Sequence, residues 1–210
     1  MRCLYCFDII QPKTDWTNVL MAERDSHLCV DCQQGFRKIE QGCPKCCNPR
    51  YTTTCPDCRK DSSLESNISF LHYNDFAKDW VARWKYRGDY ELIKSMHAYL
   101  PFFIKGKAVP VPLSEERLEE RGFNQAEAIL HILGKKPHNL LGRTHAEKQS
   151  KKTKREREQE PNPFYVKRPV KGNVLLIDDI YTTGTTMKKA AQILKENGAT
   201  SVKGLTLFRS

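Results

Sequence analysis

The sequence contains no long hydrophobic run. Its 210 residues are 39% hydrophobic with a mean hydropathy of −0.63, and no stretch approaches the roughly 20 consecutive apolar residues of a membrane helix. The start of the chain, MRCLYCFDII, also lacks the apolar core of a signal peptide. We therefore expect a protein that is neither inserted into a membrane nor exported, and that works in the reducing cytoplasm.

Two further features are missing. The six histidines are scattered along the chain, so the sequence identifies no general base and no imidazole metal site. No segment carries a recognisable set of base-reading residues, and a sequence-specific DNA-binding protein is therefore not expected.

Cysteine, in contrast, is abundant. Eight of the nine cysteines form four CxxC pairs, which in a reducing compartment indicate metal ligands rather than disulfides. Two intervening residues let both sulfurs of a pair reach one tetrahedral zinc ion, whereas a redox pair normally stands alone. We predict two structural Zn²⁺ sites and favour sequential pairing over an interleaved cross-brace, which gives one set of Cys3, Cys6, Cys29 and Cys32, and a second of Cys43, Cys46, Cys55 and Cys58. Cys47 is left over.

A polar, serine-rich stretch divides the chain near residues 60–66. Residues 1–62 are predicted to form a zinc module, whose core is too small to fold without metal. Residues 67–210 show the strand and helix patterns of a larger domain. A strand is expected at 68–73, then a helix capped by Asp75, then a second helix opened by Asp89. Trp80 and Trp84 are spaced for the apolar face of the first helix, which favours a core role over base stacking.

The most informative segment is VLLIDDIYTTGTTM, residues 174–187. Four apolar residues predict a buried strand, and a hydroxyl-rich turn at a helix start attracts an anion through its N–H groups and the helix dipole. A final strand at 202–208 completes a β-α-β unit. Carboxylates that accept hydroxyl groups beside a phosphate-binding turn suit a ribose 5-phosphate, although an ordinary strand before a capped helix is the alternative. The candidate residues are Asp178, Asp179, Thr182, Thr183, Gly184, Thr185 and Thr186.

This segment resembles the ribose-phosphate signature of type I phosphoribosyltransferases, which bind 5-phosphoribosyl pyrophosphate (PRPP) with Mg²⁺. The resemblance implies an α/β fold with a central, mainly parallel sheet flanked by helices. It further implies that the two aspartates hold the ribose hydroxyls, that residues 182–186 cradle the 5′-phosphate, and that Mg²⁺ arrives with the ligand. Residues 109–111 are expected to form another central strand. By the same resemblance, the loop after it contacts pyrophosphate through Pro112, Leu113 and Ser114.

Three other runs narrow the resemblance: WKYRGD (84–89), VPVPLSEERLEERGFNQAE (109–127) and EKQSKK (147–152). Together with the cysteine pairs they resemble the ComF family of competence proteins, which combine a zinc module with a phosphoribosyltransferase-like domain. This resemblance implies a protein that binds PRPP and single-stranded DNA and assists the uptake of transforming DNA. Two alternatives remain open. One is a true phosphoribosyltransferase acting on a base or another nucleophile, and the other is an adaptor for a helicase-like DNA-translocating ATPase.

Arg121 begins the run RGFNQ, at the start of a helix expected to end before Gly134. Such a turn at a helix start suits a ligand-facing role, so Arg121 is a further candidate for PRPP binding. A solvated arginine beside an ordinary helix cap is the alternative.

Positive charge gathers in one segment. Residues 135–171 hold twelve Lys and Arg against four Glu, and their weak apolar periodicity predicts a basic, flexible loop at about 143–165. The loop would close over pyrophosphate through Lys148, offer a track to nucleic-acid phosphates, or simply be solvated. The nucleic-acid candidates are Lys151, Lys152, Lys154 and Arg155 of this loop, together with Lys85 and Arg87, which stand at a helix end just before Gly88.

We expect elemental analysis of the purified protein to give two zinc ions per chain, because eight cysteines are spaced for ligation. Native mass spectrometry, compared with the acid-unfolded protein, measures the stoichiometry. One zinc ion per chain would mean that half of the CxxC pairs are not ligands.

Overall fold

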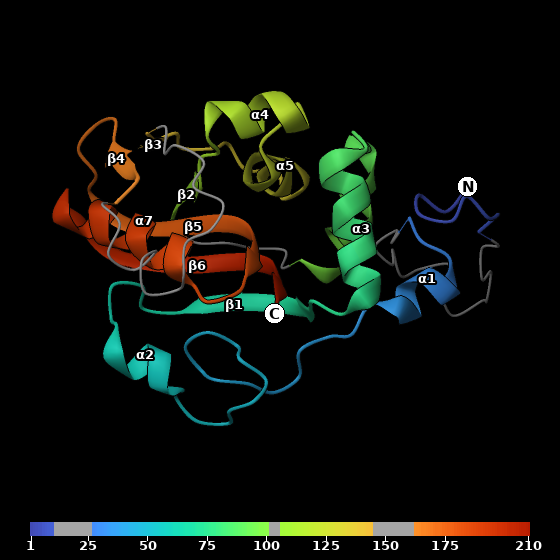
Figure 1. The fold of residues 1–210 in the computed structure, drawn as a ribbon, viewed down its shortest axis with the longest axis horizontal. Coiled ribbons are helices and arrows are strands. Elements are labelled where there is room, and N and C mark those ends of the chain that lie inside the picture. Colours follow the sequence, from blue (N-terminus) through green and yellow to red (C-terminus); the bar gives the residue numbers. More distant parts are fainter. Residues whose placement is uncertain (11–26, 101–105, 145–161) are drawn as a thin grey trace, which may run out of the picture.

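A computed structural model describes residues 1–10, 27–100, 106–144 and 162–210 (Figure 1). Its centre is a parallel four-stranded sheet with the strand order β1-β6-β5-β2. The strands are β1 (Asn67–His72), β2 (Lys107–Pro110), β5 (Gly172–Tyr181) and β6 (Ala199–Arg209). A separate antiparallel pair, β3 (Leu141–Arg143) and β4 (Phe164–Val166), flanks the segment predicted to be a basic loop. Residues 145–161 of that loop lie outside the described residues.

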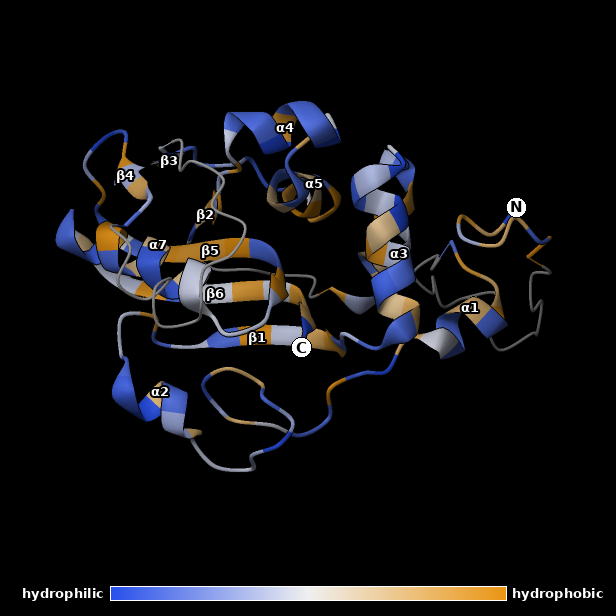
Figure 2. Ribbon diagram, viewed as in Figure 1, coloured by the Kyte–Doolittle hydropathy of each residue, from blue (hydrophilic) through white to orange (hydrophobic). Residues whose placement is uncertain are grey.

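The sheet is covered on both faces. Helix α7 (Thr185–Glu196) joins β5 to β6, and its Met187, Ala190 and Leu194 belong to one core cluster with Val174 and Val202. The opposite face is covered by α3 (Asp75–Tyr86), α5 (Gln125–Ile132) and the 3-10 helix η1 (Tyr90–Tyr99). Figure 2 shows hydrophobic residues along β5 and β6 between these layers, whereas α4 (Glu115–Arg121), which has no buried residue, is mainly hydrophilic. The predicted α/β fold with a parallel sheet flanked by helices is confirmed.

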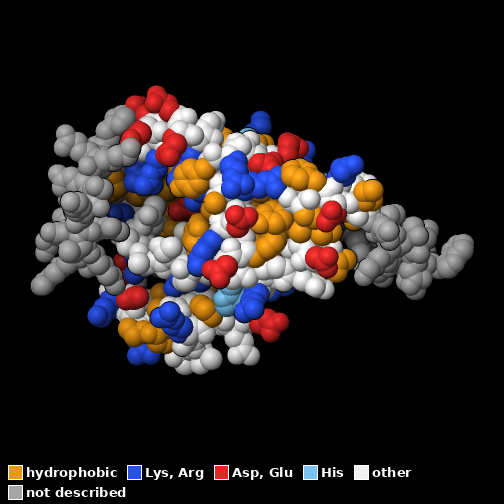
Figure 3. Space-filling view, turned by 45° about the vertical axis from the view of Figure 1, so that its right-hand side comes forward, with side chains coloured by type: hydrophobic (Ala, Val, Ile, Leu, Met, Phe, Trp, Pro, Cys, Tyr) orange, Lys and Arg blue, Asp and Glu red, His pale blue; other side chains and the backbone are white. Residues whose placement is uncertain are grey.

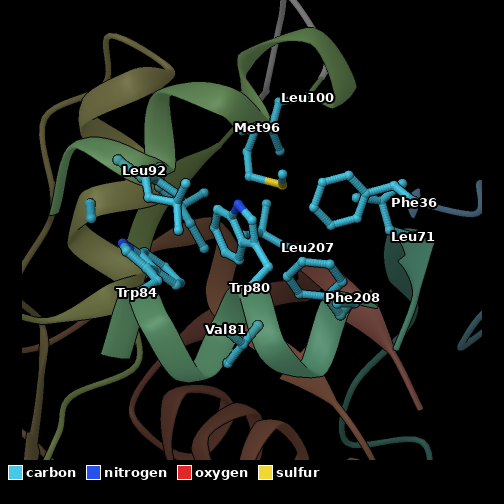
Figure 4. Close-up of a cluster of buried hydrophobic side chains, with 14 of the residues drawn as sticks. Phe36, Leu71, Trp80, Val81, Trp84, Leu92, Met96, Leu100, Leu207 and Phe208 are labelled. Carbon is cyan, nitrogen blue, oxygen red and sulfur yellow. The ribbon is translucent and has the colours of Figure 1, made fainter. Parts of the chain in front are cut away.

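An aromatic cluster fills the space between α3 and the sheet (Figure 4). Trp80 and Trp84 are completely buried and lie 5.2 Å apart between ring centroids, and Trp80 also contacts Phe208 of β6 at 5.8 Å. Aromatic pairs at such distances add to the stabilisation from apolar burial. The prediction that both tryptophans belong to the core is therefore confirmed.

The cysteine-rich segments pack into the two core clusters of the sheet and its helices and do not form a separate core. Cys3 and Cys32 pack in the cluster that contains Trp80, and Cys43 and Cys58 pack in the cluster of α7. Helix α1 (Val30–Gly35) lies beyond α3, and α2 (Pro56–Lys60) lies below β1 (Figure 1). The domain boundary at about residues 62–67 stays a prediction.

Some local expectations were wrong. In the part of the chain that the structure describes, β2 is the outer neighbour of β5 and not a central strand. The helix α3 begins one residue earlier than expected, because the side chain of Asn74, and not that of Asp75, accepts a hydrogen bond from the N–H of Ala77 at 2.9 Å. The second helix, η1, follows Asp89 as expected and is a 3-10 helix.

Candidate functional site

The candidate site lies at the carboxyl end of β5, the end at which parallel α/β sheets bind their ligands. The N–H of Val111, just beyond β2, donates to Ile177 O at 2.9 Å. This bond places the start of the segment from Pro112 to Ser114 beside the end of β5. Ser114 then occupies the N-cap position of α4. The structure thus brings the predicted pyrophosphate loop next to the predicted carboxylate pair.

The two aspartates belong to β5 itself and differ in their surroundings. Asp178 is half-buried and accepts a hydrogen bond from the N–H of Asp179 at 2.9 Å. Asp179 is 8% exposed, and its Oδ1 accepts from the N–H of Ile180 at 2.9 Å. Its Oδ2 forms an ion pair with Nζ of Lys85. Of the two carboxylates, Asp178 is therefore the more accessible to a ligand.

Lys85, which was predicted as a nucleic-acid contact, lies inside the protein. Its side chain is only 11% exposed and points to Asp179, so it offers no exposed charge to nucleic acid in this structure. One signal was available: Lys85 lies four residues after Val81 and one after Trp84, on the apolar face of α3. A lysine on such a face requires a buried partner.

This ion pair separates the acidities of the two aspartates. Removal from water, together with the negative charge of Asp179, raises the pKa of Asp178. Removal from water acts in the same direction on Asp179, but the ammonium of Lys85 outweighs it and lowers the pKa of Asp179. Asp179 is thereby held as the permanent anion, and Asp178 is the group more easily protonated.

The turn after β5 combines exposed hydroxyl groups with a conformation that requires glycine. Thr182, Thr183 and Thr186 are exposed, and the hydroxyls of Thr183 and Thr185 are 2.9 Å apart. Gly184 has φ of 79° and lies so close to Tyr181 that a Cβ would collide with the tyrosine hydroxyl. Gly184 precedes the first residue of α7. Hydroxyls and a helix start thus face solvent together, as an anion site requires.

Arginines gather near the carboxylates. Arg121 donates from Nη1 to Gln125 Oε1 at 2.9 Å, while its buried Nε has no hydrogen-bond partner among the described residues. Burial and the nearby charges of Arg117 and Arg121 lower the pKa of Arg143, and Asp178 acts in the opposite direction. Arg117 and Arg143 were not predicted as site residues. Positive charges that cluster beside few carboxylates favour an anionic ligand.

The eight paired cysteines form two groups, and the grouping is sequential. The first cysteine group contains Cys3, Cys6, Cys29 and Cys32, and the second contains Cys43, Cys46, Cys55 and Cys58. Sulfurs of Cys6 and Cys29 are 3.5 Å apart, and those of Cys46 and Cys55 are 3.7 Å apart. A tetrahedron of Zn–S bonds of about 2.3 Å has sulfurs about 3.8 Å apart. Both groups could therefore hold zinc.

The acidities of the thiols also suit a metal. Burial opposes ionisation, yet hydrogen bonds from backbone N–H groups outweigh it and lower the pKa of Cys3 and Cys43 to about 7. Burial raises the pKa of Cys6 and Cys46 to about 11. Each group thus has one thiol that ionises readily, and a divalent cation would stabilise the remaining thiolates.

The basic candidates are only partly placed. Arg87 is exposed after α3, whereas Lys148, Lys151, Lys152, Lys154 and Arg155 lie outside the described residues. On the face drawn in Figure 3, lysines and arginines alternate with acidic and apolar side chains and form no continuous basic track. No helix in the described ranges is both long and apolar enough to cross a membrane.

Comparisons with known proteins agree with this geometry. A model of the phosphoribosyl transferase domain matches residues 119–210. The competence protein ComFC of Streptococcus pneumoniae (strain ATCC BAA-255 / R6) is 34% identical over 100% of both chains. ComFC of Bacillus subtilis (strain 168) is 38% identical over 99% of this chain and 95% of that protein. The DNA utilization protein YhgH of Escherichia coli (strain K12) is 26% identical over 87% of this chain and 90% of that protein.

The two aspartates should respond differently to the same substitution. Asp179→Asn leaves the buried Lys85 without a counter-ion, and we expect the free energy of unfolding to fall by about 3 kcal/mol. Asp178→Asn should not lower it. Because the folded-state pKa of Asp178 is raised, ionising this group costs stability as the pH rises past the ordinary carboxyl range.

Urea unfolding of both variants measures the difference, and Asp75→Asn on the surface of α3 is the matched control. Equal losses in Asp178→Asn and Asp179→Asn would contradict the assigned ion pair.

Proposed function

Because the chain belongs to the ComF family of competence proteins, we propose that it binds PRPP with Mg²⁺ and assists the uptake of single-stranded DNA into the cytoplasm. The observation that carries the proposal is the half-buried Asp178 at the end of β5, directly before the exposed threonines of the turn. These groups suit the two ends of a ribose 5-phosphate, because a carboxylate accepts from hydroxyls and the turn offers N–H and hydroxyl donors.

Within this site, Asp178 is the main acceptor for a ribose hydroxyl. Both oxygens of Asp179 already have partners, the N–H of Ile180 and the ammonium of Lys85. Asp179 therefore holds the end of β5 against α3. Any contact that it makes with the ligand must leave its bonds to Ile180 and Lys85 in place. Arg121, with Arg143 nearby, provides positive charge for the pyrophosphate.

Magnesium would be held largely by the ligand. Mg²⁺ prefers oxygen ligands and usually keeps several waters and phosphate oxygens. The described site offers one accessible carboxylate, Asp178, beside a cationic cluster, which suits a metal that arrives with the ligand. The metal would neutralise phosphate charge when bound, while the protein residues orient the ribose.

A role in DNA handling is supported by the relatives and by the charge of the chain. Two relatives are competence proteins and a third is a DNA utilization protein. The net charge of +10 favours binding to phosphate backbones, and residues 135–171, with twelve Lys and Arg against four Glu, contribute eight of these charges. None of the nine cysteines forms a disulfide, which leaves the eight paired cysteines available as zinc ligands. A DNA-translocating ATPase is the partner we propose for such a role.

Transfer of the phosphoribosyl group is the second candidate function. It is favoured by the presence of both aspartates and the complete threonine turn, which simple DNA binding does not require. A screen for pyrophosphate release against nucleobases and DNA separates the two functions, because only transfer liberates pyrophosphate.

We expect calorimetry to detect binding of PRPP in the presence of Mg²⁺. The substitution Asp178→Asn should weaken it on the order of 10- to 100-fold, because the amide NH2 that replaces one carboxyl oxygen cannot accept from a ribose hydroxyl. Asp75→Asn, an exposed aspartate on α3, should bind like wild type. Unchanged affinity in the double variant Asp178→Asn/Asp179→Asn would rule out the assigned site.

Single-stranded DNA should bind with an affinity that falls steeply as salt concentration rises. Replacing Lys151, Lys152, Lys154 and Arg155 with glutamine should reduce the slope of log affinity against log salt by roughly 3, if all four contact phosphates. The control replaces four exposed lysines elsewhere, Lys38, Lys60, Lys78 and Lys203. Fluorescence anisotropy with a labelled oligonucleotide measures both, and salt-independent binding would contradict the proposal.

A further inference from the structure

Arg209, near the end of the chain, connects the second cysteine group to the threonine turn. This arginine is only 6% exposed, and its guanidinium donates to three carbonyls from two separate segments. Nε donates to Cys46 O at 3.0 Å, and Nη1 donates to Tyr181 O at 3.1 Å and to Thr182 O at 2.8 Å. In the sheet, Arg209 of β6 is the direct neighbour of Tyr181 of β5. One side chain thus joins a CxxC loop to the first residues of the turn.

Tyr181 extends this connection to the rest of the turn. The guanidinium carbon of Arg209 lies 5.1 Å from the centre of the Tyr181 ring. The tyrosine hydroxyl lies against Gly184, where no Cβ could fit. Tyr181 belongs to the same buried cluster as the four cysteines of the second group. The turn therefore lies against a side chain that the cysteine group and Arg209 hold in place.

The start of α7, which follows the turn, has further contacts with the segment that carries Cys55 and Cys58. Lys188 of α7 forms an ion pair with Asp61 at 3.6 Å and donates to Asp57 O at 3.3 Å. Asp57, in α2 between Cys55 and Cys58, and Thr183 and Thr185 of the turn line a shared cleft of about 520 Å³. Helix α2, which carries Cys58, and the turn thus form two walls of one cleft.

The first cysteine group is attached elsewhere. Arg83 of α3 donates to Tyr5 O and lies over the ring of Phe7 at 4.7 Å. Within the described ranges, these contacts lead to α3, the helix that also carries Lys85, and not to the threonine turn. The two groups can therefore be distinguished experimentally.

We propose that metal binding at the second cysteine group sets the shape of the phosphate-binding turn, with Arg209 as the positioning residue that connects them. Loss of the metal frees the four cysteines and displaces the carbonyl of Cys46. The guanidinium then loses one of its acceptors, and because a buried donor must be paired, Arg209 shifts and releases the carbonyls of Tyr181 and Thr182. The proposal rests on the proposed function, since it assumes that the turn binds the phosphate of PRPP.

Thermodynamic linkage gives a direct test on the unmodified protein. If metal at the second group strengthens ligand binding, the ligand must strengthen metal binding by the same factor, and we expect most of this gain in affinity to appear as slower release of the metal. Zinc transfer to a chromogenic chelator is followed with excess Mg²⁺, with and without PRPP, and with ribose 5-phosphate as a second probe. We expect the ligand to slow the release of one zinc ion per chain about tenfold and to leave the other unchanged.

Two variants identify which cysteine group holds the zinc ion that PRPP retains, and whether Arg209 is required. Cys3→Ser/Cys6→Ser removes metal from the first group, and the ligand-dependent zinc ion should remain. Arg209→Lys keeps the charge but cannot reach all three carbonyls, so PRPP should no longer slow zinc release and should bind about tenfold more weakly.

Calorimetry distinguishes a failure of the proposed function from a failure of the connection through Arg209. If PRPP does not bind wild-type protein at all, the proposed function fails and this inference fails with it. If PRPP binds with the expected affinity but does not alter zinc release, or if Arg209→Lys behaves like wild type, only the connection through Arg209 is overturned.

Discussion

The candidate site depends on a lysine buried against a carboxylate. Lys85 and Asp179 are each 11% exposed in their side chains and pair at the end of β5. Neither charge is tolerated there alone, since a single buried ion costs far more than a paired one. The pair therefore requires α3 to lie across the carboxyl end of the sheet, and it divides two adjacent aspartates into a fixed anion and an accessible acceptor.

The helix α3 carries this constraint to the rest of the molecule. Trp80 and Trp84 pack on the same helix as Lys85 and bury its apolar face against the sheet. From the outer side, Arg83 holds the first cysteine group through Tyr5 and Phe7. The second cysteine group is joined to β6 and the turn by Arg209. The cysteine groups thus border the site from two directions, the first through α3 and the second through Arg209 and the turn.

Much of this arrangement could be predicted from local patterns. The strand, turn and helix at 172–196 follow from an apolar run, a positive-φ glycine and a helical period, which act over a few residues. The cysteine pairs indicate ligands by their spacing, and the tryptophans indicate a core by their helical period. These patterns can be recognised without knowing which distant segment of the chain each residue contacts.

The remaining features depend on contacts between distant segments. Lys85 was predicted to face nucleic acid because it stands near a helix end, and only the tertiary structure brings Asp179 to it. Arg209 ends a buried strand, and its acceptors come from a CxxC loop and a neighbouring strand. The outer position of β2 likewise depends on the strand order, which local propensity does not determine. The residues that connect the parts were therefore the hardest to predict.

Hydrogen exchange of the backbone amides tests the central claim most directly, because it locates the ligand without any substitution. We predict that PRPP with Mg²⁺ slows exchange in residues 178–186 of the zinc-loaded protein, and that removal of zinc reduces this protection. Protection that appears elsewhere in the chain, with no change in residues 178–186, would contradict the account.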